Sequence, residues 1–186
     1  MNTGKTHNAG LFTLEHTGVL AKSARTAVRM AEEHFNIPRL PSQSYPFQIA
    51  TLGELDPEEI SEDRFARLVL YERPGARACE RRYRICLQDN IILRRIEEEK
   101  PSIVLHDLLL YVLLHEIIHV IRFQREELDF EAPEHERMSE ERIVHQLTHD
   151  ILADFDSSGI QLLLERYSPY RPDRDLITDS KRLLIL

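Results

Sequence analysis

A long, largely apolar segment at residues 102–124 reads SIVLHDLLLYVLLHEIIHVIRFQ. Its composition predicts one helix of about twenty residues, with Ser102 as the N-cap. Apolar residues surround this helix on nearly every side, so we expect it to be central and buried. Its charged and histidine side chains would be costly in a bilayer, which favours a core helix over a membrane span.

Within this helix, His115-Glu116-Ile117-Ile118-His119 places three ionisable side chains among apolar neighbours. Residues four apart on a helix lie one turn above each other, so both imidazoles can reach one metal ion, with Glu116 beside them. Left unpaired, such groups are costly to bury. Neutral histidine is a good zinc ligand, and a nearby glutamate can accept a proton from metal-bound water. The pattern predicts a Zn²⁺ site with His115 and His119 as ligands and Glu116 as the catalytic residue.

This motif resembles that of the zincin superfamily, metal-dependent hydrolases built on a helix that carries HExxH, and the resemblance covers roughly residues 80–155. It implies an α+β, zincin-like fold with a small twisted β-sheet, the buried HExxH helix and a following ligand-bearing helix. Zincins place an edge strand before the HExxH helix to align an extended substrate. Residues 90–94 (NIILR) occupy that place here.

The third metal ligand follows from the branch of the superfamily. The metzincin continuation HExxHxxGxxH is absent, whereas the gluzincin branch takes a glutamate from the next helix, and Glu141 fits that pattern. His145 stands where the branch has an acidic residue one turn later. The sequence leaves four other third ligands open, namely Glu140, His135, His145 and His149.

The rest of the chain suggests helices around a small sheet. A flexible N-terminus at residues 1–13 should precede a single domain at 14–186, which begins with an amphipathic helix from Leu14 to Phe35. A proline-rich extended connection should then lead to a short helix near Ile60. Branched and alternating apolar runs predict three strands, the last two as a hairpin: residues 65–71, 83–87 and 91–96.

After the HExxH helix, acidic residues and Pro133 predict a solvated loop over residues 126–138. Ser139 should then cap a second helix that carries Glu141 in its first turn and continues toward Arg166. The tail beyond this helix could pack back through Leu183 to Leu186.

Composition narrows the classes of partner. The chain of 186 residues has a formal net charge of −8 and no basic run, which argues against nucleic acid. The start MNTGKTHNAG lacks the pattern of a secretion signal, so a cytoplasmic location is the default expectation. Cys79 and Cys86 are expected to be free thiols. Oligomeric state is not encoded in any recognisable pattern.

These features predict a small zinc metallopeptidase that acts on a peptide or protein substrate without a membrane or nucleic-acid partner. His149, Tyr167 and Arg166 are candidates to stabilise the oxyanion. One alternative is a catalytically silent zincin-fold module that binds metal and regulates a partner. Another is a di-iron carboxylate protein, because Glu116-Ile117-Ile118-His119 is also a Glu-x-x-His unit.

Overall fold

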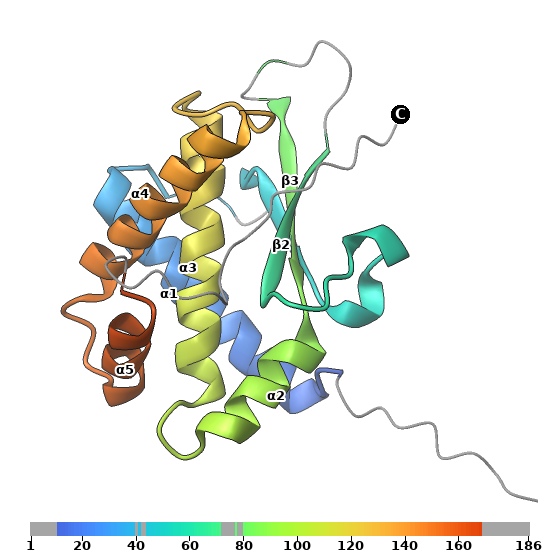
Figure 1. Ribbon diagram of the computed structural model, residues 1–186, viewed down its shortest axis with the longest axis vertical. Coiled ribbons are helices and arrows are strands. Elements are labelled where there is room, and N and C mark those ends of the chain that lie inside the picture. The colour runs from blue at the N-terminus through green and yellow to red at the C-terminus, as the bar shows by residue number, and fades with distance from the viewer. Residues whose placement is uncertain (1–10, 40, 42–43, 72–76, 78–79, 169–186) are drawn as a thin grey trace, which may run out of the picture.

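The central element of the fold is α3 (Leu105–Gln124), which packs against every other α-helix and against two strands. The computed structural model describes residues 11–39, 41, 44–71, 77 and 80–168. In Figure 1, α3 runs between α4 and α5 on one side and the sheet on the other. The prediction of a central buried helix is confirmed, but its N-cap is Val104 rather than Ser102.

The described chain forms an α+β fold with five α-helices and one three-stranded sheet. Its other elements, in chain order, are α1 (Leu14–Phe35), β1 (Phe47–Ala50), the 3₁₀ helices η2 (Leu52–Glu54) and η3 (Pro57–Glu59), β2 (Ala66–Tyr71), β3 (Arg82–Leu87), α2 (Asp89–Glu99), α4 (Glu134–Leu152) and α5 (Ser158–Arg166). The helix predicted from Leu14 to Phe35 is confirmed as α1, with Thr13 as its N-cap.

The sheet is mixed, with the order β1-β3-β2. The central strand β3 is parallel to β1 and antiparallel to β2. On the inner face of β3, the ring of Tyr83 stacks on Phe123 of α3 with 6.1 Å between centroids. Successive side chains of a strand point to opposite faces, so Arg84 and Cys86 lie on the outer face. Two of the three strands were predicted, whereas β1 was not.

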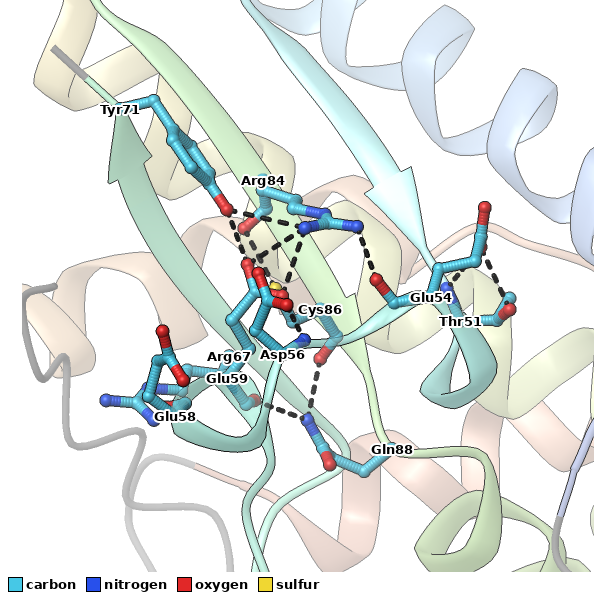
Figure 2. Close-up of polar contacts among 10 residues, drawn as sticks. All are labelled: Thr51, Glu54, Asp56, Glu58, Glu59, Arg67, Tyr71, Arg84, Cys86 and Gln88. Atoms are coloured by element: carbon cyan, nitrogen blue, oxygen red, sulfur yellow. Dashed lines mark hydrogen bonds and ion pairs between the residues drawn. The ribbon is translucent and has the colours of Figure 1, made fainter. Parts of the chain in front are cut away.

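A polar cluster holds η3 against the outer face of the sheet (Figure 2). The Glu59 carboxylate accepts hydrogen bonds from the Tyr71 hydroxyl at 2.5 Å and from the Arg84 guanidinium at 3.0 Å. The Gln88 amide donates to the carbonyls of Glu59 and Cys86, both at 3.1 Å. The helices therefore cover one face of the sheet and the η2–η3 segment covers the other.

The third predicted strand is wrong, because residues 91–96 belong to α2. Ile91, Ile92 and Ile96 are buried while Asn90 and Arg94 are exposed, which is the spacing of one helix face. The expected hairpin turn at residues 88–90 is the start of this helix. The substrate-aligning strand assigned to residues 90–94 is wrong for the same reason.

The second predicted helix begins earlier and ends sooner than expected. Its N-cap is Pro133 rather than Ser139, so α4 absorbs part of the predicted loop. The Ser139 hydroxyl instead donates to the carbonyl of His135 inside the helix. The helix ends at Leu152, and α5 begins separately with Ser157 as its N-cap. Glu141 consequently lies in the middle of α4, not in its first turn.

Several sequence predictions concern residues that the structure does not describe. They include residues 1–10, Cys79, and the tail from Leu183 to Leu186. The last part of the predicted flexible N-terminus is described, and there the Phe12 amide donates to Asp89 at 2.9 Å. Cys86 is a buried free thiol, as expected. None of the described helices is long and apolar enough to cross a membrane.

Candidate metal centre

The two histidines of the HExxH motif point their Nε2 atoms at each other. His115 and His119 lie one turn apart on α3, and their Nε2 atoms are 3.2 Å apart. Both side chains are buried, at 6% and 4% exposure. A buried pair of imidazole nitrogens at this distance needs a proton or a cation between the two rings.

Glu141 brings a carboxylate from α4 to the same point. Its Oε1 lies 3.3 Å from His119 Nε2, and its Oε2 lies 3.4 Å from His115 Nε2. Ligand atoms about 2.0–2.1 Å from a tetrahedral zinc ion lie about 3.3 Å from one another. The two histidines and Glu141 therefore have the donor set and the spacing that fit one zinc ion.

The two glutamates of this centre have pKa values that are shifted in opposite directions. Burial opposes ionisation of Glu141, but attraction and hydrogen bonds from His119 and His115 outweigh it and hold the pKa of Glu141 well below its usual value. Burial raises the pKa of Glu116, although the same histidines oppose the shift. Glu116 Oε2 is buried without a hydrogen-bond partner among the described residues. Glu141 is thus suited to bind a cation, and Glu116 to accept and release a proton.

A small cavity lies beside Glu116. It has a volume of about 20 Å³ and is lined by residues of the β2 start, α3 and α4, including Phe65, Tyr111, His115, Glu116 and His145. A cavity of roughly 10–15 Å³ is sufficient for one water molecule when polar partners surround it. A single water can therefore occupy the space between Glu116, His115 and His145.

His145 forms an outer part of the centre. Its ring centroid lies 4.6 Å from that of His115, and candidate ligand atoms of His115, Glu141 and His145 lie within 4.8 Å of one another. The corresponding contacts among His115, His119 and Glu141 are shorter, at 3.2–3.4 Å. Burial, together with the nearby His115, lowers the pKa of His145 to about 3, so the ring stays neutral.

Tyr111 is a site residue that the sequence interpretation missed. Its hydroxyl lies 3.3 Å from His145 Nδ1, and burial raises its pKa. Tyr111 stands four residues before His115, so the spacing that related the two histidines also places Tyr111 on their face of α3. Within the described structure, no other hydrogen bond is formed by the Tyr111 hydroxyl.

The remaining candidates lie outside the group of three ligand atoms. Glu140 is buried and forms a two-point ion pair with Arg122, at 2.6 and 3.0 Å. His135 is exposed at the surface next to Glu136. His149 and Tyr167 contact the Tyr111 ring, with centroid distances of 6.2 and 5.6 Å. A further candidate, Arg166, is paired with Glu99.

The orientation of the two histidines depends on packing. Zinc-binding histidines commonly donate their second ring N–H to an acceptor. Here Nδ1 of His115 and Nδ1 of His119 are buried without a partner in the described part of the chain. The His119 ring stacks on Phe123 with 5.9 Å between centroids, so aromatic contact and helix packing hold it in place.

Comparison with known proteins finds no relative of this chain. The chain matches no protein-family model, no curated protein and no solved structure.

Proposed function

We propose that this protein is a zinc-dependent hydrolase, a small zincin-like metallopeptidase that uses His115, His119 and Glu141 to hold the ion. The observation that carries the proposal is the convergence of two imidazole nitrogens, 3.2 Å apart, with the Glu141 carboxylate, whose two oxygens lie 3.3 and 3.4 Å from them, beside a buried glutamate. Glu116 Oε2, which has no hydrogen-bond partner among the described residues, supports the proposal, because a zinc-bound water would supply that partner.

Zinc with three protein ligands keeps a fourth position for water, whose pKa falls to about 7. With such a water bound, Glu116 would serve as the base that accepts its proton and as the acid that returns the proton to the leaving amine. Its raised pKa suits this exchange, because a carboxylate with a higher proton affinity is a better base.

We assign His145 as the donor to the carbonyl oxygen that gains negative charge. In this assignment the Tyr111 hydroxyl, which has no other described acceptor, is the donor and His145 Nδ1 the acceptor of the hydrogen bond between them. The hydrogen of the neutral ring then sits on Nε2, which is left to donate to the substrate. This assignment replaces the sequence-based candidates His149, Tyr167 and Arg166.

Strand β2 supports a peptide as the substrate class. β2 is an edge strand with β3 as its sheet partner in the described chain, and Phe65 and Ala66 at its start line the cavity beside Glu116. The backbone N–H of Gln88 donates to the Phe65 carbonyl, so by alternation Ala66, Leu68 and Leu70 turn their backbone groups to the open edge. An extended peptide can add there as a further strand.

The decisive experiment combines metal analysis with hydrolysis of a dye-labelled unfolded protein such as casein. The wild type should contain one equivalent of zinc and cleave the probe. Glu116→Gln should retain the zinc and lose cleavage by at least roughly 100-fold, because it keeps the shape and removes the base. His115→Ala should lose both. Zinc in none of these proteins would overturn the proposal, and iron in its place would favour the di-iron alternative.

One observation favours the silent, regulatory module as a second candidate. The cavity beside Glu116 has room for a water molecule but not for a peptide, so cleavage requires the segment at Arg64 and Phe65 to move away from α3. If Glu116→Gln leaves every measured property of the zinc-loaded protein unchanged, the silent module is the correct reading.

A further inference from the structure

A second, larger cavity lies on the opposite side of α3 from the candidate metal centre. Its volume is about 280 Å³, and it opens between α1, the start of β1 and α3. The α3 residues that line it include Ile117, Val120 and Ile121, whereas His115 and His119 face α4. An engineered apolar cavity of roughly 150 Å³ binds benzene, so this space accommodates a somewhat larger molecule.

The wall of this cavity contains a buried carboxylate. Glu32 of α1 is 7% exposed, and its Oε1 accepts a hydrogen bond of 2.6 Å from the Tyr45 hydroxyl. A contact this short is typical of a hydroxyl that donates to a charged carboxylate. In the described part of the chain no lysine, arginine or histidine forms an ion pair with Glu32, and Oε2 accepts no hydrogen bond.

Aromatic rings stand next to this carboxylate. Tyr45 and Phe47 both line the cavity, and their ring centroids are 5.7 Å apart. Aromatic faces attract cations, and a carboxylate beside them adds a full opposite charge. Val28, Ile37 and Ile117 complete the wall with apolar surface.

Two arginines also line the cavity, but at its exposed rim. Arg125 is already paired with Glu127 and lies over the Phe35 ring, 5.1 Å from its centroid. Arg82 is exposed to solvent, which screens its charge. Inside the cavity the buried charge is therefore that of Glu32.

We infer that this cavity is a binding site for a small apolar molecule that carries a primary ammonium group. The ammonium pairs with Glu32 Oε2 and contacts Tyr45 and Phe47, while the apolar part fills the space against α1 and α3. The inference is independent of the metal centre, since no residue is shared by the two sites.

Calorimetric titration of the isolated protein with three probes of similar size tests this site. 2-Phenylethylamine should bind at least tenfold more tightly than 2-phenylethanol, and 3-phenylpropanoate should not bind. Equal affinity for the amine and the alcohol, or preference for the acid, overturns the inference without any variant. Metal content is measured in the same samples, so a failed metal proposal would leave this result intact.

Substitution locates the site. Glu32→Gln keeps an acceptor for Tyr45 and should abolish the preference for the amine over the alcohol. The matched control is Glu33→Gln, which removes a neighbouring exposed carboxylate and should leave the preference unchanged. An unchanged preference in Glu32→Gln would place the amine elsewhere and overturn the assignment. Circular dichroism confirms that both variants are folded.

Discussion

At the level of single residues, two adjacent glutamates on α4 have different partners. Glu141 faces His115 and His119, whereas Glu140 is paired with Arg122. The sequence identified Glu141 through the resemblance to gluzincins. It could not find the partner of Glu140, because Arg122 lies on another helix and ion pairs between helices leave no local pattern.

The adjacent residues Glu140 and Glu141 give the first prediction. Glu141→Gln should weaken zinc binding by more than roughly 100-fold, because it removes a charged ligand. Glu140→Gln should leave zinc binding intact and lower the free energy of unfolding by roughly 2–4 kcal/mol, because Arg122 loses a buried partner. Competition with a chromogenic chelator measures the first quantity, and urea denaturation of the metal-free proteins the second. If only the Glu140 variant lost zinc binding, Glu140 would be the metal ligand and the assignment of Glu141 would be wrong.

The hydroxyl of Tyr111 gives the second prediction. Tyr111→Phe removes the hydroxyl that is hydrogen-bonded to His145 Nδ1 and leaves the ring packing in place. Turnover of the casein probe should fall by about tenfold while zinc content and KM stay the same, since the lost interaction acts through the charge that develops in the transition state. Tyr167→Phe, which removes the hydroxyl of a ring beside Tyr111, is the control and should keep its turnover.

At the level of elements, the helices α1 and α3 were predictable from the sequence. The isoleucine-rich segment at residues 91–96 was not. The apolar periodicity of α1 and the composition of α3 gave their positions. Residues 91–96 were misassigned because isoleucine favours strands, and a short apolar run does not separate the two structures. Two adjacent buried residues, Ile91 and Ile92, fit a helix face and not the alternation of a half-buried strand.

The cluster around Glu59 gives the third prediction (Figure 2). Burial would raise the pKa of Glu59, but hydrogen bonds from Tyr71 and Asp56 and the charge of Arg84 outweigh burial and lower it from the ordinary value of 4.5. A folded-state pKa below the unfolded one adds stability that is complete above the unfolded value and is lost as the pH falls through the folded value. Acidification should therefore weaken the attachment of η3 to the sheet.

Glu59→Gln should lower the free energy of unfolding by about 3 kcal/mol at pH 7, because Arg84 is left without its carboxylate. The difference between wild type and variant should begin to shrink below about pH 4.5, where the unfolded chain takes up a proton at Glu59, and should be lost as the pH falls through the lower folded-state pKa. Urea denaturation across this pH range measures the difference. Glu58→Gln, at an exposed neighbouring position, should show little change at any pH. A constant difference between wild type and the Glu59 variant would mean that charge does not hold the cluster together.

At the level of the whole molecule, the candidate centre joins two consecutive helices, α3 and α4, through side chains that face each other across their contact. The spacing of His115, Glu116 and His119 was readable from the sequence because it is set within one helix. The contributions of Tyr111 and His145 depend on how α4 lies across α3, which local spacing does not determine. The same holds for Glu32, whose significance arises only when α1, β1 and α3 enclose a cavity around it.

The hydrophobic core extends through the whole described fold, and this leads to the last prediction. One cluster of buried hydrophobic side chains connects α1, the sheet, α3 and the C-terminal helices, and we expect it to hold these elements together without an ion. Removal of zinc with a chelator should therefore leave the helical circular dichroism signal intact and lower Tm. Zinc at about 100 times its Kd should restore about 2.7 kcal/mol of stability. His119→Ala should show no zinc-dependent shift, and His135→Ala, at an exposed position, should retain it. If the chelator unfolds the protein instead, the ion is a structural requirement of the fold, and a site that must stay closed to hold the protein together would argue against hydrolysis.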